Sequence, residues 1–465
     1  MSREVRGRTG PLRVHFATSE VFPLVKVGGL GDVAQALPKS LARRGHRVDL
    51  FLPRYTGLPA GRRVAALDVA AGTARARFEV ADQGEHDGVR YYTVGTAEQL
   101  PWDRPEGYVE KDLASFVLFS RAVARLAADW RPDAVHCNDW HVGHVPAYLR
   151  TLNAPCRSVL TIHNLAYQGL FPHSMAGELG LTEYGTGNLL AQGITHADAV
   201  TTVSDRYRDE TLSPLRGCGL DGLLRERGGA YSGVLNGVDY DQFDPGADPH
   251  LPARYDVGDL AGKAVCKAEL QRTSGLPVDP AVPLVAFVGR LVKQKGVELL
   301  LEAVDELAAL DAQFVFVGRG DRFERAFARA ARFYPNVAFH ADSREPVARL
   351  AYAGSDMFLA PSEFEPCGLA PLIALRYGSV PLVRRVGGMA QTVADPGLGL
   401  SFTGNDRAQL LGALWDGIER YRGGQGWARL RERAMRARYT WDEAAASYER
   451  LYRPPAADRE KGHRR

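Results

Sequence analysis

Short runs of apolar, β-branched residues alternate along the chain with longer segments in which apolar residues recur at helical spacing. In the first half, these runs predict strands over residues 12–17, 47–52, 134–137, 157–161 and 199–203. In the second half, they predict strands over residues 284–288, 314–317, 337–339, 357–359 and 380–383. Because parallel strands need crossover connections, this alternation predicts parallel sheets covered by helices.

Two helical segments illustrate the pattern. The first covers residues 32–44, and Pro38 inside it predicts a kink or an early restart. The second runs from Val297 to Leu307, where apolar residues return every three or four positions and predict one helical face. Since each lies between predicted strands, both are expected to cover a sheet.

The alternation of strands and helices occurs in both halves of the chain, which indicates two doubly wound α/β domains. No exact internal repeat of the kind that marks a solenoid is present. The irregular stretch 239–259 is rich in Asp, Pro and Gly and marks the expected boundary. We therefore expect one domain over 12–245 and a second over 246–453, whose last helix could pack back on the first. Residues 1–11 are expected to be disordered, and 454–465 to form a flexible tail.

Composition narrows the class of protein. The chain has 465 residues, 45% hydrophobic and 24% charged, and its 58 basic and 55 acidic residues give a net charge of +3. This balance disfavours nucleic acid or an anionic membrane as the main partner. No signal peptide or run of about 18–20 apolar residues is found. Five cysteines without a Cys-x-x-Cys pair argue against disulfides and zinc, so a reduced cytoplasm is expected.

Loops that follow strands are the candidate sites, because open α/β sheets bind ligands there. The first such loop is Lys26-Val27-Gly28-Gly29, just before a predicted helix. Glycines let backbone N–H groups approach an anion, and lysine adds charge, although this loop alone is also typical of an ordinary turn. It lacks the Gly-x-Gly-x-x-Gly pattern, which disfavours a dehydrogenase.

Two loops in the second half carry opposite charges. Arg290 and Lys295 flank a turn at a helix start, which suits a pyrophosphate, although a solvated basic loop fits as well. Glu365 lies in the loop 362–369, where a carboxylate could bind sugar hydroxyls or could be an incidental surface acid. Cys367 in the same loop is expected to be a small buried apolar residue.

Two further loops in the first half contain histidine. His163 and Asn164 follow one predicted strand, and Asp139 follows another within the segment 136–141. A single histidine is more often structural than catalytic. Histidine and asparagine together at a strand end favour contact with a sugar.

These motifs together resemble a known family, the bacterial glycogen synthases and plant starch synthases. The resemblance covers about residues 12–453 and is carried by KVGGLGDV (26–33), HVGHVPAYL (141–149), TIHNLAYQG (161–169), ITHADAVTTVS (194–204), GCGLDGLL (217–224), LNGVDY (235–240), GKAVCKAELQ (262–271), GRLVKQKG (289–296), PSEFEPCGLAPL (361–372) and VRRVGGMAQTV (383–393). It implies the GT-B fold, in which two Rossmann-like domains with doubly wound parallel sheets face a central cleft. In that fold, 12–245 would be the acceptor-side domain and 246–453 the nucleotide-sugar-binding domain. It also implies transfer of glucose from ADP-glucose to an α-1,4-glucan with retention of configuration.

The resemblance assigns a role to several residues. Arg290 and Lys295 match the pair that binds the donor phosphates, and Glu365 matches the glutamate that holds the glucose. His163 matches the histidine whose backbone carbonyl faces the anomeric centre. Further substrate-binding residues are implied at Lys26, Gly28, Gly29, Asp32, Asp139, Asn164, Asn236, Cys367, Gly368 and Leu369. No metal and no cofactor is expected.

Departures from the family pattern leave alternatives open. Ala370 and Pro371 replace a hydroxyl and an amide near the donor, and Ser343 stands where many members carry a tyrosine that stacks on adenine. A related transferase that uses a UDP- or GDP-sugar is therefore an alternative, and a non-catalytic glucan-binding protein is another. Oligomeric state, glucan chain-length preference and regulation cannot be predicted from the sequence.

Overall fold

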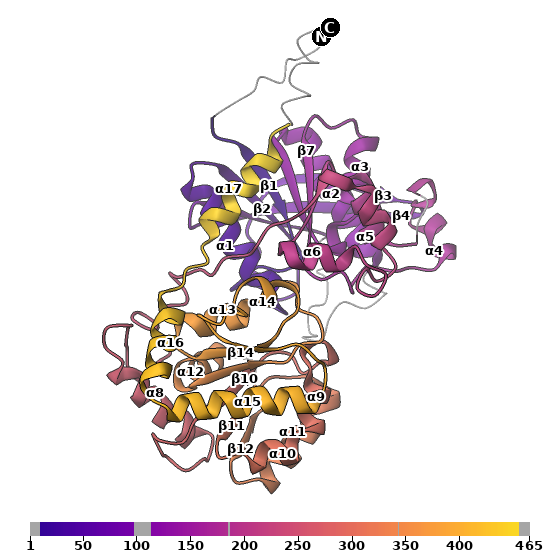
Figure 1. The fold of residues 1–465 in the computed structure, drawn as a ribbon. Coiled ribbons are helices and arrows are strands. Elements are labelled where there is room, and N and C mark those ends of the chain that lie inside the picture. The colour runs from indigo at the N-terminus through magenta and orange to yellow at the C-terminus, as the bar shows by residue number, and fades with distance from the viewer. Residues whose placement is uncertain (1–9, 97–112, 185–186, 343, 455–465) are drawn as a thin grey trace. The chain divides into compact units, whose positions relative to one another are not determined.

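The computed structural model describes residues 10–96, 113–184, 187–342 and 344–454. The chain forms two compact units. The first comprises Met1–Val203, Arg208–Leu235 and Trp441–Arg465, and the second comprises Ser204–Tyr207 and Asn236–Thr440. Both units are α/β domains (Figure 1).

The first domain is built on a mostly parallel sheet, which has nine strands among the described residues. Their order in the sheet is β3 (Arg62–Ala71), β4 (Ala74–His86), β5 (Val89–Gly95), β2 (Arg47–Pro53), β1 (Arg13–Ala17), β6 (Ala134–Asn138), β7 (Arg157–Ile162), β8 (Ala199–Thr202) and β9 (Tyr231–Gly233). The β3–β4 and β4–β5 pairs are antiparallel, and the other pairs are parallel. The strands of the predicted parallel core are therefore neighbours at the centre of the sheet.

Helices cover this sheet and complete its core. They are α1 (Gly29–Arg43), α2 (Leu113–Trp130), α3 (Val145–Thr151), α4 (His173–Glu178), α5 (Leu189–His196), α7 (Asp221–Glu226) and α17 (Trp441–Tyr452), with 3-10 turns η2 (Trp140–Val142), η3 (Thr182–Tyr184) and η4 (Gly228–Ala230). The helix α6 (Asp205–Thr211) has residues in both units. The predicted restart at Pro38 is wrong, because α1 runs through this buried proline as one helix.

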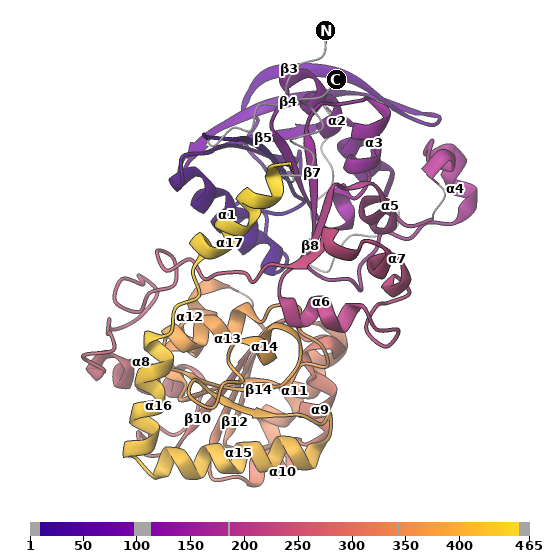
Figure 2. The same ribbon diagram turned by 45° about the horizontal axis from the view of Figure 1, so that its top comes forward.

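The last helix, α17, lies beside α1 and packs against β7 (Figures 1 and 2). Its Tyr452 hydroxyl lies 2.7 Å from Nδ1 of His136, whose Nε2 lies 2.7 Å from Oγ1 of Thr161. At the surface, Glu449 pairs with Arg44 at 2.8 Å. Because a buried polar group needs a partner, this network ties the end of the chain to the centre of the first domain.

The second domain contains a parallel sheet of six strands in the described part of the chain. Their order is β12 (Val337–His340), β11 (Gln313–Val317), β10 (Leu284–Val288), β13 (Met357–Ala360), β14 (Val380–Arg384) and β15 (Leu400–Phe402). Along β10, Val285 and Phe287 join one apolar cluster, whereas Leu284 and Ala286 join another. Since successive side chains point to opposite faces, the sheet is buried on both sides.

The covering elements of this domain are α8 (Ala261–Thr273), η5 (Lys293–Lys295), α9 (Val297–Glu302), α10 (Val304–Ala309), α11 (Asp321–Phe333), α12 (Glu345–Gly354), α13 (Leu369–Arg376), α14 (Gly387–Gln391), α15 (Arg407–Arg422) and α16 (Gln425–Arg436). The single helix predicted from Val297 to Leu307 is two short helices, separated at Ala303. Every helix in the described ranges is too short or too polar to cross a membrane.

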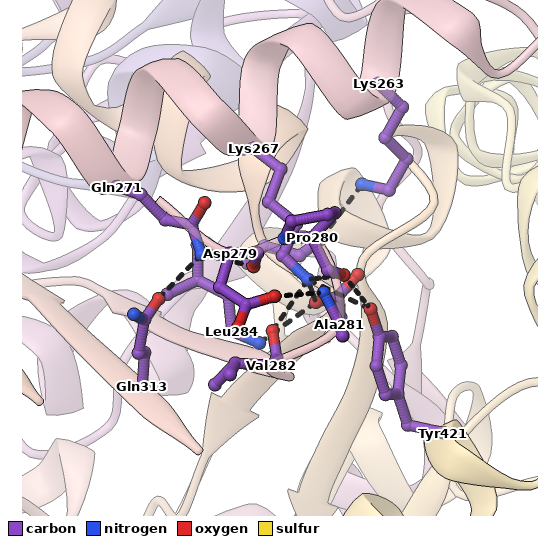
Figure 3. A network of polar contacts seen from close by, with 12 residues as sticks. Lys263, Lys267, Gln271, Asp279, Pro280, Ala281, Val282, Leu284, Gln313 and Tyr421 are labelled. Carbon is purple, nitrogen blue, oxygen red and sulfur yellow. Dashed lines mark hydrogen bonds and ion pairs between the residues drawn. The ribbon is translucent and has the colours of Figure 1, made fainter. Parts of the chain in front are cut away.

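Two lysines from α8 reach into the protein and bind the ends of other elements (Figure 3). Lys263 Nζ donates to the carbonyl oxygens of residues 353, 355 and 377 at 2.8–3.0 Å. Lys267 Nζ lies 2.7 Å from Asp356 Oδ2, which also accepts the N–H of Leu284 at 2.9 Å. Because Asp356 precedes β13 and Leu284 begins β10, this pair joins α8 to the amino-terminal edge of the sheet.

Replacing Lys267 with methionine is expected to lower the free energy of unfolding by about 3–5 kcal/mol, because it leaves the buried Asp356 carboxylate without its cation. Urea unfolding measures the change. Arg272→Met is the control, since Arg272 pairs with Glu269 at the exposed face of the same helix and should contribute less than about 1 kcal/mol. If both variants lose the same free energy of unfolding, the buried Lys267–Asp356 pair stabilises the fold no more than the exposed pair does.

Candidate active site

Three neighbouring strands of the first domain carry the predicted site residues of that domain. β1, β6 and β7 are adjacent and parallel, so their carboxyl ends lie at one edge of the sheet. Lys26 follows β1 in the loop before α1, Asp139 follows β6, and His163 follows β7. This edge is the place at which open parallel sheets bind ligands.

Lys26 is held at the start of α1. Its Nζ lies 2.8 Å from Asp32 Oδ1 and 5.3 Å from the centre of the Phe22 ring. Asp32 stands in the first turn of α1, where a carboxylate is favoured by the helix dipole. The two residues that the sequence assigned separately therefore form one ion pair, and the lysine side chain remains partly exposed.

A carboxylate that the sequence analysis missed binds the same loop. Glu20 Oε2 accepts the backbone N–H of Val27 at 2.7 Å and that of Gly28 at 3.0 Å. Gly28 is the N-cap residue of α1, and Gly29 is the first helical residue. The N–H group of Gly28, expected to face an anion, thus already faces one from the protein itself.

Asp139 fixes the loop after β7. Its Oδ1 accepts the N–H of His163 at 2.7 Å and that of Asn164 at 3.4 Å, and its own N–H donates to Thr161. Its backbone has φ 59° and ψ −175°, a conformation found almost only at glycine. For another residue this conformation costs about 1–3 kcal/mol, and such strain is concentrated at functional sites. Burial raises the pKa of Asp139 to about 7, and the Glu20 carboxylate adds to the rise, whereas the two N–H donors oppose it.

The His163 imidazole is oriented by a second residue that the sequence analysis missed. Its Nε2 lies 2.9 Å from Oδ1 of Asn138, and the Asn138 amide donates to the carbonyl of Ala17 at 3.0 Å. Because that amide oxygen is only an acceptor, Nε2 carries the proton. Burial lowers the pKa of His163 to about 3, so the imidazole is neutral at pH 7.

In the second domain, adjacency of β10 and β13 brings the basic and acidic loops together. Lys295 Nζ lies 2.5 Å from Glu365 Oε2, and the same oxygen accepts the Ser362 hydroxyl at 3.1 Å. The Glu365 carboxylate is buried, whereas the Lys295 side chain is 25% exposed. The two loops thus form a single charged unit at the carboxyl edge of the sheet.

Two glycines allow these loops to approach so closely. Gly296 has φ +73°, and a Cβ there would overlap the carbonyl oxygen of Pro361. Gly387 has φ +47°, and a Cβ there would overlap the carbonyl oxygen of Glu365. Since L side chains rarely adopt such φ values, these positions favour glycine on two independent grounds.

The remaining predicted residues of this domain include Arg290, Asn236, Gly368 and Leu369. Arg290 follows β10, and no hydrogen bond or ion pair of its guanidinium is found within the described ranges. Asn236 is buried, and its Oδ1 has no hydrogen-bond partner among the residues that the structure describes. Gly368 is the N-cap residue of α13 and has φ +89°, and Leu369 begins that helix. An arginine guanidinium and a buried amide oxygen of this domain thus have no partner within the described residues.

Cys367 is a buried thiol, as expected for a small apolar residue. Burial raises the pKa of Cys367 to about 12, and the Glu365 carboxylate adds to this rise, while an N–H donated by Asn236 opposes it. The thiol is therefore not a nucleophile at neutral pH. Ser343, on which the choice of nucleotide base was expected to depend, lies outside the described residues.

No group of three or more His, Cys, Asp or Glu side chains that could hold a metal ion is found in the part of the chain that the structure describes. The chemistry present at the two sheet edges is instead that of cations, buried carboxylates and amides. This set suits an anionic ligand that also carries hydroxyl groups.

Comparison with known families identifies both domains. Residues 13–226 match the model of the starch synthase catalytic domain, and residues 282–419 match that of group 1 glycosyl transferases. With its two parallel-sheet α/β domains, the chain is a glycosyltransferase of the GT-B class.

Full-length relatives narrow the assignment. The chain is 40% identical to glycogen synthase 2 of Geobacter sulfurreducens, over 97% of this chain and 100% of the relative, and 41% identical to a glycogen synthase of an Anaeromyxobacter species, over 96% and 100%. The solved catalytic domain of starch synthase IV from Arabidopsis thaliana, bound to ADP and acarbose, superposes with a TM-score of 0.87 at 30% identity, covering 96% of this chain and 99% of that one. The chain belongs to the glycogen and starch synthase family.

Proposed function

We propose that this protein transfers glucose from ADP-glucose to the non-reducing 4-hydroxyl of an α-1,4-glucan such as glycogen, with retention of configuration. Family membership supports the reaction class. The observation that carries the assignment of residues is the Lys295–Glu365 pair, which joins the loops after the adjacent strands β10 and β13, together with Arg290 in the loop after β10. This arrangement offers two cations for a diphosphate and a buried carboxylate for sugar hydroxyls.

The proposed role of the cations is to stabilise the leaving group. A nucleoside diphosphate gains negative charge as its bond to the anomeric carbon breaks, and preorganised cations stabilise charge where it develops. An ammonium group has three donors, so Lys295 can keep its bond to Glu365 while it binds phosphate. Arg290 can bind two phosphate oxygens at once through its planar guanidinium.

The proposed sugar contacts of the second domain come from a carboxylate and an amide. Glu365, held by Lys295 and Ser362, accepts hydrogen bonds from glucose hydroxyls. The amide oxygen of Asn236, which has no hydrogen-bond partner among the described residues, can accept another. In the first domain, Asp139 holds the backbone of His163, whose carbonyl is proposed to face the anomeric centre. Lys26 is proposed to add positive charge near the donor phosphates.

The bonds of the reaction balance without a protein nucleophile. The bond from the anomeric carbon to the β-phosphate oxygen breaks, and a bond from that carbon to the acceptor 4-oxygen forms. The acceptor proton passes to the departing phosphate oxygen on the same face of the sugar. The proposed compartment is the cytoplasm, where the five cysteines, all free in the structure, stay reduced.

A donor panel tests the proposal. With glycogen as acceptor, we expect incorporation of labelled glucose from ADP-glucose to exceed that from UDP-glucose and GDP-glucose in kcat/KM. A preference for UDP-glucose or GDP-glucose would contradict the proposed donor and favour a related transferase that uses a UDP- or GDP-sugar. Absence of incorporation from all three would favour a non-catalytic glucan-binding protein.

A further inference from the structure

Glu20 is a buried carboxylate that has no place in the proposed chemistry so far. It follows β1 and is 5% exposed. Its backbone is fixed on both sides, because its N–H donates to Oγ1 of Thr18 at 3.3 Å and its carbonyl accepts the Thr18 hydroxyl at 2.9 Å. The chain then closes a small turn, in which the N–H and C=O groups of Val21 and Val25 pair at 2.9 Å. The carboxylate therefore has a defined position.

One oxygen of this carboxylate binds two consecutive N–H groups of the loop that carries Lys26. The donors are Val27 at 2.7 Å and Gly28 at 3.0 Å, both within the usual range of N–H···O hydrogen bonds. Gly28 has no side chain with which to cap α1, and the helix start carries partial positive charge. Glu20 thus supplies from a neighbouring segment the acceptor and the negative charge that a capping residue would supply.

This contact limits how the loop can meet a diphosphate. While Glu20 holds the N–H groups of Val27 and Gly28, a phosphate cannot use them. The first turn of α1 still presents N–H groups that a helix cannot satisfy internally, and Lys26 stands beside them. The carboxylate therefore leaves the loop in one conformation, with its lysine and its first helical turn as the groups that face an anion.

Glu20 also lies close enough to Asp139 for its charge to act on that residue. Two carboxylates thus hold two loops at this sheet edge. Glu20 binds the loop after β1, and Asp139 binds the loop after β7. Burial of a charged group is costly unless its hydrogen bonds are strong. The hydrogen bonds from Glu20 to the N–H groups of Val27 and Gly28 offset this cost and fix the loop. We propose that Glu20 is a positioning residue that holds the Lys26 loop in the conformation that binds the donor diphosphate.

This inference rests on the proposed function, and calorimetric titration with ADP separates the two. The proteins are wild type, Glu20→Gln, Glu20→Asp and, as a matched control, Glu85→Gln, an exposed carboxylate of the same domain. We expect Glu20→Gln to weaken ADP binding and raise the KM for ADP-glucose by about tenfold, the order of one charge-assisted hydrogen bond. The KM for glycogen should stay unchanged, and Glu85→Gln should match wild type.

Glu20→Asp, which keeps the charge on a shorter stem, should fall between wild type and Glu20→Gln. If Glu20→Gln does not fold, Glu20→Asp supports the same comparison. A folded Glu20→Gln that binds ADP as well as wild type overturns the inference. Tighter binding also overturns it, because Glu20 would then compete with the phosphate.

A wild-type protein that binds UDP or GDP in place of ADP would contradict the proposed donor, and the Glu20 comparison would then be made with that nucleotide. Absence of binding to all three nucleotides would overturn both proposals. The wild-type titration therefore tests the proposed function, and the difference between wild type and variant tests Glu20.

Discussion

Replacing Lys295 with alanine is expected to lower kcat for glucose transfer by about 10²–10³-fold, the usual cost of removing one preorganised donor that faces developing charge. The ammonium group lies at the carboxyl edge of the second sheet and has two N–H groups beyond the one that binds Glu365. Initial rates at saturating ADP-glucose and glycogen measure the change. The KM for ADP-glucose should rise less than kcat falls, because the leaving group gains charge only in the transition state.

The chain offers a close control for this variant. Lys293 is two residues earlier in the same turn, but its ammonium pairs with Glu298 at 3.1 Å and its side chain is 63% exposed. Lys293→Ala should therefore keep the wild-type kcat. If Lys295→Ala also keeps it, the phosphate contact is wrong. If both variants lose activity equally, the loss reflects the turn and not the one ammonium group.

The sequence predicted the parallel core because its strands are apolar on both faces. It did not predict β3, β4 and β5, which form an antiparallel ribbon at one edge of the first sheet. Most residues of β3 are exposed or half-buried, and only Val69 and Ala71 are buried. Its first residues, Arg62 and Arg63, pair with acidic side chains on β4. A half-exposed, charged strand lacks the apolar run by which the others were found.

The candidate site shows a similar division. Lys295 and Glu365 could be selected from the sequence, because each stands in a loop between a strand and a helix. Their pairing could not be predicted from spacing, since it depends on β10 lying next to β13 although two strands intervene in the chain. Glu20 and Asn138 were missed because nothing in a single sequence separates an acid or amide that binds backbone from one that faces water.

Asp139 illustrates a third limit. Its residue type and its position after a strand could be read from the sequence, and they led to its assignment as a substrate-binding residue. Its conformation, with φ at 59°, follows from the N–H groups of His163 and Asn164 that its carboxylate accepts and from the N–H that it donates to Thr161. Tertiary contacts of this kind override the local preference of an L-residue.

Glu365→Gln is expected to lower kcat about 10–100-fold, because hydrogen bonds to a charged acceptor contribute about 1.5–3 kcal/mol and glutamine lacks the charge. The KM for ADP-glucose should rise by a smaller factor, since the phosphate contacts of Arg290 and Lys295 remain. Steady-state kinetics with glycogen as acceptor measure both. Glu363→Gln is the control, an acid in the same loop whose backbone binds Gln294 and Arg384. Wild-type activity in Glu365→Gln would remove this carboxylate from the sugar site.

Combining Lys295→Ala with Glu365→Gln tests whether the two residues act as one unit. The Nζ–Oε2 contact of 2.5 Å means that either single variant also disturbs the partner: loss of the lysine leaves a buried carboxylate without its cation, and loss of the charge weakens the hold on the lysine. The fall in log kcat for the double variant should therefore be smaller than the sum of the two single falls. Strict additivity would mean that the pair is incidental and that each residue meets the donor independently.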